Sequence, residues 1–200
     1  MVTIEEVRKN NEIWDRSVCD YVERALLKYA ADHSNFSYQS IKEMAYLINT
    51  DYSTRVSNVD LTAIAEGIST ISDIKNRLNK GDISLVNEIS EFAHKKSGSI
   101  KTYPSFASKF CYMYNMDKFP IYDSIAKNIL YELNTIDKFT NVKILKSERL
   151  SYDKYVQVYK DFQNHYGLQE FSFWQIDKFL WVKGKQNEGG FASETFVSIS

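Results

Sequence analysis

The sequence is poor in residues that break helices, form disulfides or bind metals. Its 200 residues include two prolines, seven glycines, two cysteines and three histidines. Cys19 and Cys111 lie far apart in the chain, which favours two buried thiols over a disulfide. No Cys-x-x-Cys or His-Glu-x-x-His spacing occurs, so we expect neither a metal site nor a cofactor.

The sequence also lacks a long hydrophobic run and an excess of charge of either sign. No apolar stretch approaches the roughly 18 residues that span a membrane, and the first residues lack the pattern of a secretion signal. The 25 basic and 26 acidic residues give a formal net charge of -1. A global basic excess for nucleic acid is therefore missing, although a local basic face needs only a few residues. We expect a cytoplasmic protein without membrane contact.

Aromatic and apolar side chains at helical spacing are abundant. Hydrophobic residues make up 44% of the chain and aromatic residues 14%, which is enough for a sizeable core. Apolar positions recur every three or four residues, and strand-like alternation is almost absent. This pattern predicts an all-α protein of about seven to nine helices.

Four helices are expected before the centre of the chain. The apolar periods place them at residues 3–32, 40–48, 61–78 and 82–93. Ser40 and Glu43 form a capping box for the second helix, Gly81 suits the end of the third, and Asp82 suits the start of the fourth. The polar segment 49–58 has no period and is predicted to be a loop.

The second half of the chain predicts further helices and a tail. Ser151 suits the start of one helix and Gly167 its end, and another helix begins near Phe173. The sequence from Gly184 has no helical period. We expect a single helical domain over residues 1–183, with a core at about 100–135, C-terminal helices at 151–183, and a flexible tail over 184–200.

Residues 103–130 contain both prolines and predict a turn, a helix, a loop and a second helix. Lys109 is expected near the start of the first helix and Asp123 at the start of the second. A lysine at the border of an apolar stripe is partly desolvated, which lowers its pKa and frees its amine to attack an electrophilic carbon. An aspartate in a cleft stabilises positive charge on a sugar. The purely structural alternative is a snorkelling lysine and a helix cap.

This region resembles the helix-hairpin-helix DNA glycosylases, most closely their bacterial 8-oxoguanine-glycosylase-like branch. Tyr103-Pro104-Ser105-Phe106-Ala107-Ser108-Lys109 resembles the Leu-Pro-Gly-Val-Gly-x-Lys hairpin of that superfamily. Phe119-Pro120-Ile121-Tyr122-Asp123-Ser124 resembles the element that carries its catalytic aspartate. Phe173-Trp174-Gln175-Ile176-Asp177-Lys178-Phe179-Leu180-Trp181 resembles the closing helix of that branch. The resemblance covers about residues 100–185.

The resemblance implies a multi-helix orthogonal array that excises a damaged base from a flipped nucleotide. Lys109 would then be the Schiff-base lysine, with lyase activity through an imine, and Asp123 the essential aspartate. DNA is the implied partner. Its expected contacts are the hairpin residues and nearby lysines, namely Ser105, Ala107, Ser108, Lys95, Lys96 and Lys101. The candidates for stacking on the base are Tyr112, Tyr114, Trp174 and Trp181.

Three features of this sequence depart from the superfamily. Ser105 and Ala107 stand where the hairpin has glycines, which let backbone N–H groups approach a phosphate. Asp123 follows Lys109 by 14 positions, a shorter interval than in the endonuclease III type. No iron–sulfur cysteine cluster is present. Two other functions therefore stay open: a non-catalytic nucleic-acid-binding module, and a protein-interaction domain of a defence or mobile-element system.

Overall fold

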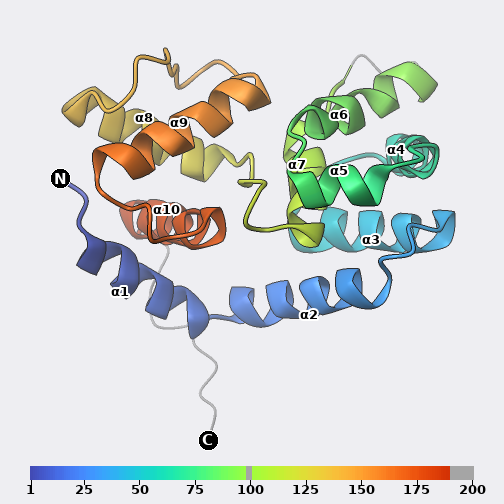
Figure 1. Ribbon diagram of the computed structural model, residues 1–200, viewed down its shortest axis with the longest axis horizontal. Helices are drawn as coiled ribbons and strands as arrows, with labels where there is room; N and C mark the ends of the chain where they lie inside the picture. Colours follow the sequence, from blue (N-terminus) through green and yellow to red (C-terminus); the bar gives the residue numbers. More distant parts are fainter. Residues whose placement is uncertain (98–100, 190–200) are drawn as a thin grey trace, which may run out of the picture. The chain divides into compact units, whose positions relative to one another are not determined.

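The computed structural model describes residues 1–97 and 101–189, and this part of the chain is all-helical (Figure 1). It contains ten helices and no β-strand. The helices are α1 (Ile4–Asp15), α2 (Val18–Asp32), α3 (Tyr38–Asp51), α4 (Asn58–Ser69), α5 (Ile74–Lys80), α6 (Ser84–Ser97), α7 (Pro104–Tyr114), α8 (Ser124–Asp137), α9 (Tyr152–His165) and α10 (Phe173–Asn187). The prediction of an all-α fold is confirmed.

The helices form two compact units. The first combines the two ends of the chain, Met1–Glu23 and the residues from Tyr122 onward, and the second is the continuous segment Arg24–Ile121. The boundary near the N-terminus falls inside α2, and the other falls between α7 and α8. Each unit has its own packed interior.

In the first unit, α10 packs against α1 and α8 (Figure 1). Gly184 of α10 permits close approach to α8, because a Cβ at this position would lie 2.2 Å from Cγ2 of Ile125. Helix α9 contributes aromatic side chains to the same interior, and the ring of Phe162 stacks on that of Phe179 at a centroid distance of 6.2 Å. Several of the largest buried side chains of this interior are aromatic.

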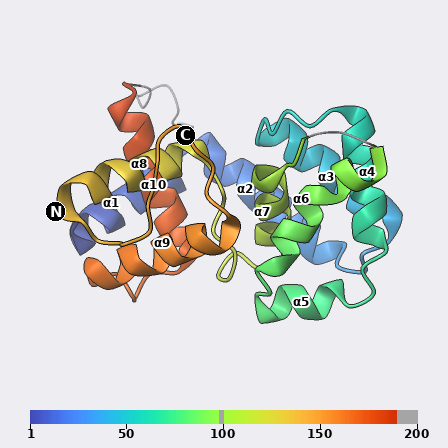
Figure 2. The ribbon, with the colours of Figure 1, turned by 90° about the horizontal axis from the view of Figure 1, so that it is seen from above.

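In the second unit, α4 packs against α3 and α6, and α7 packs against α3 and α6 (Figure 2). Gly67 of α4 allows α6 to approach, since a Cβ there would lie 2.3 Å from the Phe92 ring. The core is rich in aliphatic side chains with almost no exposed surface. They include Ile41, Met44, Ile48, Leu61, Ile64, Ile68, Leu85, Val86 and Ile89.

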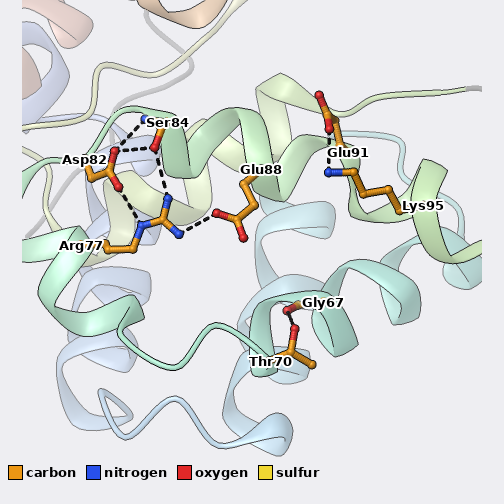
Figure 3. Close-up of polar contacts among 8 residues, drawn as sticks. All are labelled: Gly67, Thr70, Arg77, Asp82, Ser84, Glu88, Glu91 and Lys95. Carbon is orange, nitrogen blue, oxygen red and sulfur yellow. Dashed lines mark hydrogen bonds and ion pairs between the residues drawn. The ribbon is translucent and has the colours of Figure 1, made fainter.

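An ion-pair network joins α5 to the start of α6 (Figure 3). Arg77 donates to Asp82 at 2.7 Å, to Glu88 at 2.6 Å and to Ser84 at 3.2 Å. Asp82 also accepts from the Ser84 backbone N–H at 3.1 Å, so it caps the helix as expected. Between these helices, Gly81 has the left-handed φ of 71° that ends α5.

Two predicted helices are each divided in the structure. The expected helix over 3–32 is interrupted at Arg16 and Ser17, where the Ser17 hydroxyl accepts from the Asp20 backbone N–H at 3.3 Å. The expected helix over 61–78 is interrupted between Ser69 and Ile74. Neither break contains glycine or proline, so an unbroken apolar period concealed both.

The capping box predicted at Ser40 is also wrong. Ser37 is the N-cap of α3, and its hydroxyl accepts from the Ser40 backbone N–H at 3.2 Å. The Ser40 hydroxyl lies one turn inside the helix and donates to the Ser37 carbonyl at 2.9 Å. Ser151 occupies the predicted N-cap position of α9 without a side-chain cap hydrogen bond, and the end predicted near Gly167 is confirmed. The predicted tail is helical as far as Asn187, and its residues 190–200 lie outside the described part.

Candidate functional site

Lys109 lies in the middle of α7 and is only 3% exposed. Pro104 occupies the first helical position, where its missing N–H costs nothing. The helix therefore begins earlier than expected, and the prediction that Lys109 opens it is wrong. One turn before Lys109, the Ser105 hydroxyl accepts a hydrogen bond from Nζ at 2.8 Å.

An aromatic ring covers the Lys109 ammonium group. Nζ lies 5.5 Å from the ring centroid of Tyr52, which belongs to the segment between α3 and α4. Asn49 fixes this segment by accepting from Thr54 and the Val56 N–H and by donating to the Val56 carbonyl. The site thus includes Tyr52, which the sequence interpretation placed in an unremarkable polar loop.

Asp123 is the N-cap of α8, as predicted. Its Oδ1 accepts from the backbone N–H groups of Ile125 at 2.6 Å and Ala126 at 3.4 Å. The preceding residue is also fixed, because the Tyr122 hydroxyl donates to the Leu150 carbonyl at 3.0 Å and accepts from its N–H at 2.9 Å. The Asp123 carboxylate therefore lies at a helix start that these hydrogen bonds hold in place.

A buried row of hydroxyl groups leads away from Asp123. The Asp123 backbone hydrogen-bonds to the Tyr155 hydroxyl. Tyr155 donates to Tyr159 at 3.3 Å, and Tyr159 donates to Oδ1 of Asp177 at 2.5 Å. Burial, reinforced by the charge of Asp177, raises the pKa of both tyrosines well above the usual value. A buried phenol needs a hydrogen-bond partner. Two tyrosines one turn apart on an apolar helix face are the feature of the sequence that could have indicated this row of hydroxyl groups.

Lys109 and Asp123 belong to different units, Lys109 to the second and Asp123 to the first. Each environment is defined within its own unit. The convergence of the two side chains on one site stays a prediction.

The expected DNA-contact residues differ in their exposure. Ala107 and Ser108 have no exposed surface, and Ser105 is half-buried. Lys101 is exposed, and Lys95 is exposed and paired with Glu91 at 2.8 Å. The side chain of Lys96 lies outside the described part.

The four expected stacking residues contact other protein side chains. Tyr112 is 1% exposed, and the Tyr114 ring packs on the Phe36 ring with 4.6 Å between the ring centroids. Trp181 makes an edge contact with Trp14 at 5.1 Å. The Trp174 indole N–H donates to Glu23 at 3.0 Å. Tyr112 is therefore a core residue, whereas the other three rings are half-buried, and stacking on a base stays a prediction.

A buried ion cluster around Lys178 was not predicted. Lys178 is 3% exposed, and its Nζ lies 2.7 Å from Asp15, 3.6 Å from Asp20 and 3.7 Å from the Trp174 ring centroid. Asp20 and Glu23 are 5% and 3% exposed. The residues come from distant parts of the sequence, so their pairing required the tertiary structure.

The described residues hold no group of three or more side chains suited to a metal ion. Cys19 and Cys111 are free thiols, and burial raises the pKa of Cys111. No helix in the described ranges is long and apolar enough to cross a membrane.

Comparison with known proteins identifies the family. The family model HI_0787_N, described as an N-terminal domain, matches residues 5–118, more than half of the chain. The chain belongs to this family. The HI_0787_N match includes Lys109 and its neighbours Ser105 and Tyr52, and it ends before Asp123. It therefore covers nearly all of the second unit, together with α1 and α2.

A curated relative extends the similarity beyond the HI_0787_N region. It is described as an uncharacterized protein of Haemophilus influenzae and is 36% identical over 138 residues. The alignment covers 69% of this chain and 63% of the relative, so the chain matches less than two thirds of that protein. No solved structure matches the chain.

Proposed function

We propose that the chain is a DNA-glycosylase-like protein that releases a damaged base, with Lys109 as the amine nucleophile and Asp123 as the assisting carboxylate. The observation that supports the proposal is the succession of α7, a loop and α8. Pro104 begins α7, Lys109 lies within it, and Asp123 caps the following helix. The glycosylase resemblance requires this order of elements.

The proposed reaction begins when the nucleotide leaves the duplex, because C1′ is otherwise hidden in the stack. The lone pair of Lys109 Nζ forms a bond to C1′ as the glycosidic bond breaks. The electron pair of the broken bond leaves with the base, which takes up a proton. The nitrogen then loses both of its protons, one of them to the sugar ring oxygen as the ring opens between C1′ and that oxygen, and an imine is left. Asp123 stabilises the positive charge that develops on the sugar.

Access to Lys109 requires a local movement. Its side chain is 3% exposed, and the Tyr52 ring lies over the ammonium group. A nucleotide reaches Nζ only after Tyr52 moves aside. The proposal therefore includes displacement of the segment between α3 and α4.

The decisive experiment is borohydride trapping of the full chain on duplex DNA. The substrates are a panel of oxidised, alkylated and deaminated bases and a preformed abasic site. Borohydride reduces the imine to a stable amine, so the wild type gives a covalent complex on a denaturing gel. Peptide mapping assigns the adduct to Lys109, and Lys109→Met abolishes it.

The matched control is Lys95→Met, which removes an exposed lysine paired with Glu91. This variant should be trapped as well as the wild type. If the wild type releases no base from any duplex and forms no adduct with abasic DNA, the glycosylase proposal is wrong.

A second candidate is a helical module that binds nucleic acid or another protein without catalysis. The observation in its favour is the burial of the hairpin-like segment, since Ala107 and Ser108 have no exposed surface. Fluorescence anisotropy with a labelled duplex at about 50 and 200 mM salt separates the two classes of partner. Salt-dependent binding that survives Asp123→Asn, without base release, favours the nucleic-acid module. Absence of binding, with a large stability loss in Phe106→Ala, favours a protein-interaction domain.

A further inference from the structure

Three side chains connect α10 to the start of α8 through the interior of the first unit. Asp177 on α10 accepts from Tyr159 at 2.5 Å, and Tyr159 accepts from Tyr155 at 3.3 Å. Tyr155 in turn hydrogen-bonds to the backbone of Asp123. Both tyrosines are 0% exposed, and Asp177 is 8% exposed. We call these three side chains the tyrosine relay.

The direction of the hydrogen bonds in the relay is determined by its charged end. Each phenol has one proton to donate. Tyr159 gives its proton to the carboxylate of Asp177, so its oxygen accepts from Tyr155. Tyr155 gives its proton to Tyr159, so its oxygen accepts from the N–H of Asp123. The carboxylate therefore polarises a row of hydrogen bonds that ends on one backbone amide.

The backbone N–H of Asp123 needs a hydrogen-bond acceptor from outside its own helix. Asp123 is the N-cap, with extended φ and ψ of -123° and 144°, and the helix provides no acceptor for its N–H. The relay holds the backbone of Asp123, while the N–H groups of Ile125 and Ala126 hold its Oδ1. Backbone and side-chain torsions are thus restrained from two sides.

We propose that Tyr155 and Tyr159, anchored by Asp177, are positioning residues that hold the Asp123 carboxylate in its reactive orientation. The role in catalysis rests on the glycosylase-like function proposed above. Packing alone does not explain the hydroxyl groups, since phenylalanines would fill nearly the same volume without the cost of burying polar atoms. Correct placement of a catalytic group is worth orders of magnitude in rate, so a small displacement is measurable.

The test separates two steps that need different residues. Release of a base requires Asp123 to stabilise charge on the sugar as well as Lys109 to attack C1′, whereas imine formation with a preformed abasic site requires Lys109 without Asp123. In Tyr155→Phe and Tyr159→Phe, we expect the single-turnover rate of base release to fall about tenfold or more. Borohydride trapping on abasic DNA should stay within about twofold of the wild type. Asp177→Asn should likewise slow base release and leave trapping within about twofold of the wild type, because it removes the charge that polarises the relay.

Tyr166→Phe is the matched control. Tyr166 is the C-cap residue of α9 and donates to a carboxylate of α8, that of Asp137, at 2.5 Å. Asp137 is at the C-terminal end of α8, whereas Asp123 is at its N-terminal end. Tyr166→Phe therefore removes a half-buried phenol-to-carboxylate bond in the same unit and should leave both steps unchanged.

A second measurement does not depend on activity. The ¹H–¹⁵N signal of the Asp123 amide should shift in Tyr155→Phe and, through two phenols, in Asp177→Asn, and should keep its position in Tyr166→Phe. An Asp123 amide that does not respond to Tyr155→Phe overturns the inference. So does a wild type that releases base at a rate Tyr155→Phe leaves unchanged. A wild type without base release or trapping, but with the expected amide shifts, instead removes the proposed function and the catalytic role with it.

Discussion

The two units of the chain fill their interiors with different chemistry. The first unit buries phenol hydroxyls against Asp177 and places the Lys178 ammonium group against Asp20. The second unit has a core rich in isoleucine, leucine and valine, and its Arg77 network is partly exposed. The second interior also buries one ammonium group, that of Lys109, against a hydroxyl and an aromatic ring. The two interiors therefore differ in degree: the first relies more on paired charges, and the second more on the fit of aliphatic side chains.

The units also differ in a way that helps measurement. All three tryptophans, Trp14, Trp174 and Trp181, belong to the first unit. Tryptophan fluorescence therefore reports on the first unit, and far-UV circular dichroism reports on the helices of both. Each of the following variants is a way to sharpen or break the contrast between the two interiors.

The largest effect is expected from Lys178→Met in the first unit. The change leaves Asp20, which is 5% exposed, without the ammonium group 3.6 Å away. Breaking one side of a buried ion pair costs about 3 kcal/mol or more. Urea unfolding followed by tryptophan fluorescence should show this loss.

The control for Lys178→Met is Arg8→Met, which removes a solvent-exposed pair with Glu170 in the same unit. Pairs of this kind contribute about 1 kcal/mol or less. Equal losses in the two variants would mean that the buried charges of the first unit are not the source of its stability.

A somewhat smaller effect is expected where each unit relies on close helix packing. In Gly184→Ala the new Cβ would lie 2.2 Å from Ile125, and in Gly67→Ala it would lie 2.3 Å from the Phe92 ring. Overpacking of this kind costs about 1–3 kcal/mol. Gly184→Ala should lower the midpoint measured by tryptophan fluorescence, and Gly67→Ala the midpoint measured by circular dichroism.

Phe92→Leu provides the check on the Gly67 result, because it removes part of the ring that the new methyl group meets. The double variant Gly67→Ala with Phe92→Leu should be less destabilised than the sum of the two single variants. Strict additivity would exclude the clash as the cause.

The first unit is also expected to lose stability at high pH. The pKa values of Tyr155 and Tyr159 are raised by burial, so the folded state keeps two protons that the unfolded state releases above pH of about 10. The stabilisation is complete below that value and declines as the pH rises further. Urea midpoints by tryptophan fluorescence should therefore fall between about pH 9 and 11. The fall should be shallower in Tyr159→Phe, and equal slopes would remove these phenols as its cause.

Much of the helical architecture was readable from local sequence. Apolar periodicity predicted the class, and Gly81, Ser151 and Asp123 marked helix ends because caps are local interactions. The breaks at Ser17 and after Ser69 were missed because no proline or glycine marks them. At the first break the overlooked local signal is Ser17, whose hydroxyl accepts from the Asp20 N–H.

The candidate site, like the fold, could be predicted from the sequence in part. Lys109 and Asp123 were found by resemblance, and the cap at Asp123 followed from its position before a helix. Tyr52 lies over the Lys109 ammonium group from the segment between α3 and α4, and no pattern in the sequence indicated this contact. The link from Asp123 to Asp177 was equally hidden, because it passes through two tyrosines that periodicity assigns to an apolar face. Contacts between residues far apart in the sequence cannot be predicted from local sequence patterns.

The smallest effect is expected from Arg77→Met, which removes the ion-pair network of the second unit (Figure 3). The Arg77 side chain is 20% exposed, and those of Asp82 and Glu88 are 34% and 37% exposed, so solvent screens the pairs. We expect a loss of about 1 kcal/mol by circular dichroism, reduced further at high salt. Asp82 keeps its bond to the Ser84 N–H, so α6 retains its start. A loss as large as that of Lys178→Met would contradict the contrast, because it would mean that the second unit also depends on its charged side chains.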